Sequence, residues 1–131
     1  MKLLNTYTYE IKKSKFIGYY YELDSIEDVQ EILNSLKIED IKEIKIILEN
    51  LKSEHKKARH VVYAYKFLST AGKSDDKEPS NTAGLPIYNI IERNNLNNVF
   101  ICVVRYFGGI KLGAGPLLRS YSHTANEVIK L

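Results

Sequence analysis

The sequence has 131 residues, of which 44% are hydrophobic. A chain of this length encloses one hydrophobic core, so we expect a single domain spanning residues 1–131. Its net charge of +3 is too small to indicate nucleic-acid binding unless the cations cluster. The longest apolar run, VFICVV at 99–104, is far shorter than the roughly 18 residues of a membrane-spanning helix. The N-terminus has no apolar signal-peptide core, and we therefore expect a cytoplasmic protein.

The first part of the chain predicts a hairpin followed by two helices. Residues 3–11 and 15–23 are rich in Tyr, Thr and Ile, which favour strands, and polar residues separate them. Ser25 and Asp28 resemble a capping box before an apolar helical stripe over 26–36. A second helix is predicted over 39–56. Its inward residues are Ile41, Ile44, Leu48 and Leu51, and its outward, solvated residues are Lys42, Lys45, Lys52 and Lys56.

The second part of the chain alternates strands and helices. HVVYAYKFL at 60–68 is typical of a strand, and a polar segment follows it at 69–84. A helix is predicted from Pro86, a central strand over 99–105, and a last helix from Pro116. Cys102 lies inside the apolar strand and is interpreted as a buried packing thiol. The pattern predicts an α+β fold, a two-layer sandwich with a mixed four-stranded sheet and helices on one face.

The stretch RYFGGIKLGAGPLLRSY at 105–121 follows the predicted central strand. Its glycines let the backbone turn sharply, and the free amides at the start of the next helix attract anions. Arg105, Lys111 and Arg119 are spaced to surround the same point. The stretch predicts an anion-binding loop, with a plain strand-to-helix turn and solvated cations as the alternative. It has neither the Lys-Ser/Thr of a P-loop nor a G-x-G-x-x-G, so no nucleoside triphosphatase is predicted.

Three carboxylates, Asp75, Asp76 and Glu78, lie within four residues of one another, and His60 opens the strand before them. Oxygen ligands of this kind can hold a divalent cation, and a carboxylate can act as a general base. Their spacing matches no known metal cage, which favours a solvated or salt-bridged acidic loop. Pairing between these carboxylates and the cations of the glycine-rich stretch would hold the two loops together.

Two long motifs resemble a known family. SDDKEPSNTAGLP at 74–86 and VVRYFGGIKLGAGPLLRSY at 103–121 are similar to motifs of the YigZ/IMPACT family, and HVVYAY at 60–65 and SKFIG at 14–18 also fit it. The resemblance covers nearly the whole chain. It implies the fold of the second domain of small-subunit ribosomal protein five. From the first loop we carry over as binding residues Asp75, Asp76, Glu78, Ser80 and Thr82. From the second loop we carry over Arg105, Tyr106, Gly108, Gly109, Lys111, Gly113, Gly115 and Arg119.

The chain departs from the family pattern at three positions. Lys77 and Asn81 stand where glycine is common, and Pro116 replaces a glycine. A position with positive φ suits Asn better than Lys. The resemblance implies that many bacterial relatives carry a further C-terminal ferredoxin-like domain. We expect this domain to be absent here, together with any function that depends on it, or the chain to be a fragment.

The resemblance implies a role in translation. Eukaryotic members restrain the amino-acid-starvation kinase pathway by competing for its activator protein, and bacterial members are suspected of binding nucleic acid. We expect a non-enzymatic binding module for translation regulation or stress response, which engages RNA or a protein partner through the two loops. We expect no cofactor, metal or catalytic residue. The alternatives are a small metal-assisted hydrolase or phosphoryl-transfer enzyme, with Mg²⁺ on the acidic loop, and a purely protein-binding adaptor.

Overall fold

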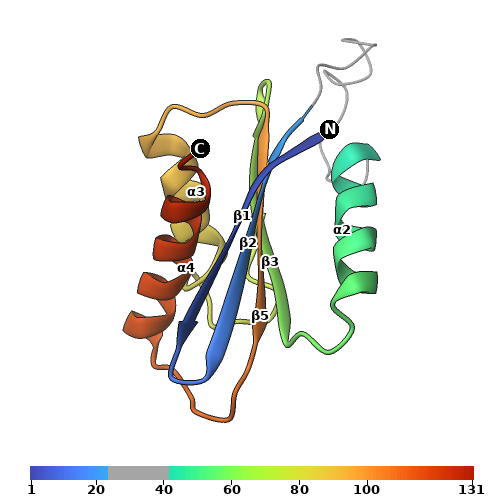
Figure 1. Ribbon diagram of the computed structural model, residues 1–131. Helices are drawn as coiled ribbons and strands as arrows, with labels where there is room; N and C mark the ends of the chain where they lie inside the picture. Colours follow the sequence, from blue (N-terminus) through green and yellow to red (C-terminus); the bar gives the residue numbers. More distant parts are fainter. Residues whose placement is uncertain (24–41) are drawn as a thin grey trace.

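The chain forms a five-stranded sheet covered by helices on both faces, as Figure 1 shows for the computed structural model. The structure describes residues 1–23 and 42–131. The strands are β1 (Lys2–Ile11), β2 (Ser14–Glu22), β3 (His60–Phe67), β4 (Thr70–Ser74) and β5 (Val99–Tyr106). The helices of the described residues are α2 (Lys42–Glu54), α3 (Gly84–Arg93) and α4 (Ala114–Val128). The strand order is β1-β2-β5-β3-β4, and every neighbouring pair is antiparallel.

The central strand β5 alternates between two hydrophobic cores because successive strand residues point to opposite faces of a sheet. Ile101 and Val103 pack beneath α3 and α4, whereas Cys102 packs beneath α2. Cys102 is therefore the buried thiol that the sequence predicts, and burial raises its pKa, which keeps it protonated. The same alternation directs Arg105 toward α4 and Tyr106 toward α2.

The predicted N-terminal hairpin is confirmed. Strands β1 and β2 pair from Lys2 opposite Glu22 to Ile11 opposite Ser14. The two residues between the strands, Lys12 and Lys13, have φ values of 46° and 65°. Positive φ at both central residues is the conformation of a type I′ turn, whose twist matches that of the paired strands.

The helices lie close to their predicted ranges. Ile44, Ile47 and Leu51 are the buried face of α2, and Lys45 and Lys52 are exposed as predicted. The helices predicted from Pro86 and Pro116 each begin two residues earlier, at Gly84 and Ala114. The predicted helix over 26–36, and Ile41, lie outside the described residues. None of the helices in the described part of the chain is long and apolar enough to cross a bilayer.

The α+β class is confirmed, but the predicted sheet was wrong in three respects. It has five strands instead of four, it is antiparallel instead of mixed, and helices cover both faces. The missed strand, β4, lies in the polar segment after β3. As an edge strand with half-covered residues it carries little apolar patterning. The second face needs a helix because β5 is apolar on both sides, and α2 covers it.

Candidate anion-binding cleft

The two motif loops lie side by side at one end of the sheet. The acidic loop (75–83) joins β4 to α3, and the glycine-rich loop (107–113) joins β5 to α4. They border a cleft of about 300 Å³. The cleft is lined by Arg59, His60, Glu78, Pro79, Arg105, Phe107, Lys111, Leu112 and Leu117.

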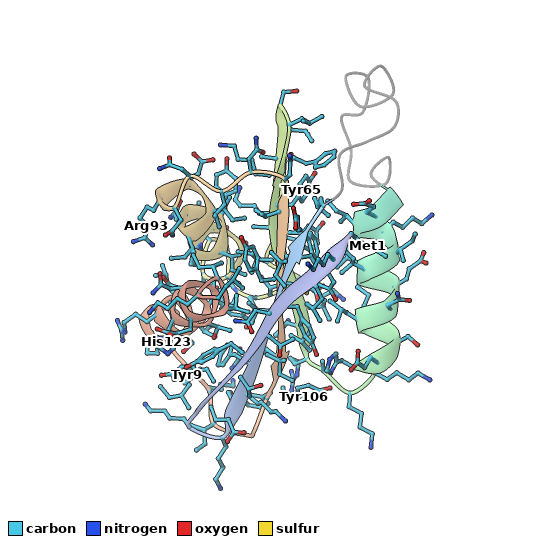
Figure 2. All side chains as sticks on the ribbon, turned by 45° about the horizontal axis from the view of Figure 1, so that its top comes forward. Met1, Tyr9, Tyr65, Arg93, Tyr106 and His123 are labelled. Carbon is cyan, nitrogen blue, oxygen red and sulfur yellow. The ribbon has the colours of Figure 1, made fainter. Side chains whose placement is uncertain are left out.

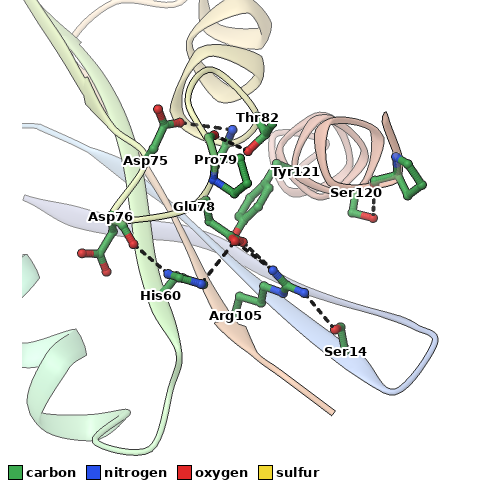
Figure 3. A network of polar contacts seen from close by, with 12 residues as sticks. Ser14, His60, Asp75, Asp76, Glu78, Pro79, Thr82, Arg105, Ser120 and Tyr121 are labelled. Carbon is green, nitrogen blue, oxygen red and sulfur yellow. Dashed lines mark hydrogen bonds and ion pairs between the residues drawn. The ribbon is translucent and has the colours of Figure 1, made fainter. Parts of the chain in front are cut away.

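Glu78 joins the acidic loop to the sheet and to α4 (Figure 3). Arg105 Nη1 donates to both carboxylate oxygens of Glu78, at 2.9 and 2.7 Å. Tyr121 Oη donates to Glu78 Oε2, and His60 Nε2 lies 3.2 Å from Oε1. The predicted pairing between the loops therefore exists, and it is made by Glu78 and Arg105.

This network is buried, which sets its electrostatics. The side chains of Arg105 and Glu78 are only 6% and 4% exposed. Two charges removed from water at this depth are held by each other, so the loss of one partner leaves an uncompensated buried charge. Burial raises the pKa of the Tyr121 phenol and the adjacent Glu78 raises it further, so that Tyr121 remains a hydrogen-bond donor. Arg105 Nε has no hydrogen-bond partner among the described residues.

The two aspartates of the acidic loop hold backbone groups. Asp75 Oδ1 accepts hydrogen bonds from the amides of Ala83 and Gly84, at 3.2 and 2.8 Å, and so caps the start of α3. Asp76 Oδ2 accepts from the Val61 amide at 2.7 Å. Both carboxylates therefore satisfy donors of the fold, and neither lines the cleft.

The remaining residues of the acidic loop complete its backbone. Thr82 is buried and donates from Oγ1 to the Pro79 carbonyl at 2.6 Å, whereas Ser80 is exposed. Lys77 and Asn81 have φ values of 70° and 64°. Both positions, where the family pattern favours glycine, thus adopt the left-handed conformation. Within the described residues, no three His, Cys, Asp or Glu side chains are grouped as metal ligands.

The glycines of the glycine-rich loop have different structural roles at different positions. A Cβ on Gly108 would lie 1.8 Å from the carbonyl oxygen of Lys13, so this position packs directly against the β1–β2 turn. Gly109 has a φ of 96°, which only glycine adopts readily. Gly113 is the N-cap of α4 and Gly115 lies in its first turn.

The cations predicted around the loop are only partly brought together. Arg105 and Lys111 line the cleft, and Lys111 is exposed at its rim. Arg119 is exposed on α4 and is not among the lining residues; its Nη1 lies 3.3 Å from the position of a Cβ on Gly115. Arg59, which precedes β3, stands at the cleft instead, with its guanidinium 4.9 Å from the centre of the Phe107 ring.

Tyr106, which the sequence predicts as a binding residue, lies on the opposite face of the sheet. Its hydroxyl is 2.6 Å from His55 Nδ1, and His55 Nε2 is 2.7 Å from the Tyr19 hydroxyl. Figure 2 shows Tyr106 on the side covered by α2. This position could have been predicted from the sequence, because successive residues of a strand point to opposite faces and Tyr106 follows Arg105.

Sequence reasoning missed Arg59 and the polar role of Tyr121. The β3–β5 register pairs His60 with Arg105, and the Arg59 amide donates to the Arg105 carbonyl at 2.8 Å. This register brings Arg59 to the cleft, and no local pattern reveals it. Tyr121 lies in an otherwise apolar stripe of α4. Because a buried Tyr hydroxyl usually has a hydrogen-bond partner, its position in this stripe could have indicated a buried polar group nearby.

The fold and the cleft define an α+β domain with a basic cleft at one end of its sheet. The model of the Impact N-terminal domain matches residues 12–129, and the chain belongs to this family. An IMPACT family member of Haemophilus influenzae is 34% identical over 93% of this chain and 54% of its own length. The IMPACT family member YigZ of Escherichia coli is 32% identical, over 92% of this chain and 54% of its own length.

Solved structures share the fold. The crystal structure of a hypothetical protein has a TM-score of 0.79 and 31% identity, and the match covers 96% of this chain and 56% of that one. The two-domain translational regulator Yih1 has a TM-score of 0.51 and 22% identity, over 97% of this chain and 45% of its own. This chain spans about half the length of the curated relatives it matches.

Proposed function

We propose that this domain is a non-enzymatic binding module linked to translation, and that the cleft engages the phosphate groups of an RNA. The observation that carries the proposal is the charge arrangement of the cleft. Glu78 and Arg105 neutralise each other at its floor, with His60 of β3 beside Glu78, while Arg59 and Lys111 stand at its rim. A surplus of cations around a recess attracts phosphate oxygens.

The surroundings of the cleft support the same partner. Lys12 and Lys13 are exposed in the turn that packs against Gly108, so further cations extend beyond the rim. Phe107 offers an aromatic surface, and aromatic side chains next to cations are the usual platform for single-stranded nucleic acid. Cations beside an aromatic ring favour RNA as the partner. A protein partner would be favoured by an apolar docking surface.

The arrangement of the carboxylates favours binding over metal-assisted catalysis. A Mg²⁺ ion needs carboxylate oxygens that are free to coordinate it. Asp75 and Asp76 accept hydrogen bonds from backbone amides, and Glu78 accepts from Arg105 and Tyr121. An ion at this loop would have to displace the contacts that hold the loop in place.

The link to translation comes from relatives. Yih1 is a translational regulator that shares the fold, and a protein IMPACT homolog of Schizosaccharomyces pombe is 29% identical over 92% of this chain. These similarities support a role linked to translation. The cleft supplies a surface through which the domain would bind its partner in this role.

Binding of a single-stranded RNA oligonucleotide at several salt concentrations tests the proposal. We expect the double variant Arg59→Gln, Lys111→Gln to bind more weakly to all sequences alike, because phosphate contacts carry no base information. Each lost contact should reduce the slope of log affinity against log salt by about 1.

The matched control is Lys45→Gln, Lys52→Gln, which removes the same charge from the exposed face of α2. It should bind RNA as the parent does. Equal weakening in both double variants would show that RNA binding depends on the net charge of the protein and not on the cleft. A folded parent that fails to bind RNA at low salt would contradict the proposal. In that case a protein partner becomes the leading candidate.

A further inference from the structure

We infer that the cleft receives the end of an RNA strand that carries a terminal phosphate, instead of a phosphodiester within the strand. This inference rests on the proposed function and adds the chemical group that the cleft recognises. It follows from the buried floor of the cleft, its charge and its apolar wall.

The floor of the cleft is closed by buried side chains. Counted as whole residues, Glu78, Arg105, Leu112 and Leu117 are 7%, 5%, 9% and 3% exposed. The exposed lining residues, Arg59, Pro79 and Lys111, stand at the mouth. The buried residues therefore form the floor and the exposed residues the mouth, and a group that enters end-on, as a terminal phosphate does, reaches the cations from the mouth inward.

The charge of the cleft matches a phosphate monoester. Arg59, Arg105 and Lys111 contribute three positive charges and Glu78 one negative charge. His60 lies beside this carboxylate, with Nδ1 2.7 Å from the Asp76 carbonyl oxygen and Nε2 3.2 Å from Glu78 Oε1. A terminal phosphate carries about −1.5 to −2 charges at neutral pH, whereas a phosphodiester carries one.

The remaining wall suits the sugar and base that follow the phosphate. Pro79, Phe107, Leu112 and Leu117 are the apolar lining residues. The Phe107 ring lies near two guanidiniums, with its centre 4.9 Å from Arg59 Cζ and 5.8 Å from Arg105 Cζ. Contact with this wall would not depend on base identity, because every base has an apolar face.

The experiment compares RNA oligonucleotides of one sequence that end in a 5′-phosphate, a 3′-phosphate or hydroxyls at both ends, each labelled away from the end under study. We expect one phosphorylated end to raise the affinity about tenfold over the hydroxyl ends, as one additional charge-assisted contact does. The Arg59→Gln, Lys111→Gln variant should lose this difference, and the Lys45→Gln, Lys52→Gln control should keep it.

Three results would overturn the inference. Equal affinity for all three oligonucleotides would leave RNA binding in place and remove the recognition of the end. A 5′-mononucleotide that binds as tightly as the phosphorylated strand would make a free nucleotide the ligand. A preference for the phosphorylated end that survives in the Arg59→Gln, Lys111→Gln variant would place the recognition outside the cleft. Failure of the parent to bind any of the oligonucleotides would instead contradict the proposed function itself.

Discussion

Glu78 interacts with side chains from three elements: His60 of β3, Arg105 of β5 and Tyr121 of α4. One carboxylate thus fixes the acidic loop against both the sheet and the helix that follows the glycine-rich loop. Its negative charge also neutralises Arg105, so the cations at the rim define the net charge of the cleft. The main role of Glu78 is therefore to stabilise the fold, and it affects the cleft by holding Arg105 in position.

Replacement of Glu78 by Gln should lower the free energy of unfolding by about 3–5 kcal/mol, because Arg105 keeps a buried charge without a counterion. Denaturant-induced unfolding measures the change. Glu92→Gln is the control, since Glu92 pairs with Lys66 at the exposed surface and its removal should leave the unfolding transition unchanged. Similar transitions for the two variants would show that the buried pair does not stabilise the fold.

Gly108→Ala should destabilise the domain by about 1–3 kcal/mol, since the new methyl group would overlap backbone that has to move. The clash is with the Lys13 carbonyl oxygen, 1.8 Å from the Cβ position. Gly115→Ala is the matched control, because its Cβ would meet only the flexible end of the Arg119 side chain. Thermal unfolding compares the two variants, and an unchanged melting temperature for Gly108→Ala would contradict the close packing of the two turns.

At the scale of elements, α2 is joined to the sheet by more than its apolar face. His55 follows its last turn and lies between the hydroxyls of Tyr19 on β2 and Tyr106 on β5. Tyr106 is the neighbour of Arg105 in the chain, so the two faces of β5 fix the start of the glycine-rich loop from opposite sides. The packing of α2 and the geometry of the cleft therefore both depend on the end of β5.

Alkaline pH should destabilise the domain through Tyr19. Burial, with the nearby Glu54 carboxylate, raises the pKa of Tyr19 from 10.0 to about 12. The unfolded chain releases this proton near pH 10 and the folded chain only near pH 12. The stabilisation is thus complete below pH 10 and is lost as the pH rises through this window.

The measurement is the free energy of unfolding in steps across the window for the parent and for the Tyr19→Phe variant. The parent should lose stability more steeply than the variant, because the variant has no phenol hydroxyl to ionise at this position. Parallel curves would show that Tyr19 does not contribute to the pH dependence.

The elements differ in how far the sequence predicts them. The hairpin, β5 and α4 follow from local patterns, because strand and helix periodicities mark their buried faces. The edge strand β4 does not, since a strand with few apolar residues resembles a loop. The meeting of the two loops was predicted from the opposite charges of their side chains. The cations of the cleft were predicted only in part. Arg105 and Lys111 line it as expected, whereas Arg59 reaches the cleft through the β3–β5 register and Arg119 folds back along α4.

At the scale of the whole molecule, basic residues from separate parts of the chain meet at one end of the sheet. Lys13 of the β1–β2 turn abuts Gly108, Arg59 precedes β3, and Lys111 lies in the glycine-rich loop. The net charge of +3 is modest, but these residues concentrate positive charge at one end of the sheet. The proposed binding of phosphate therefore depends on the electrostatic field at this end of the sheet and not on the overall charge of the protein.

The most direct test of phosphate binding in the cleft is an NMR titration of the amide-labelled protein with a 5′-phosphorylated single-stranded RNA. We expect shifts for the backbone amides of residues 59–60 and 107–113, and for the side chain of Arg105, with the amides of α2 unaffected on its exposed face. Shifts confined to α2 or to the outer edge of β1 would contradict this expectation, because the RNA would then bind away from the cleft.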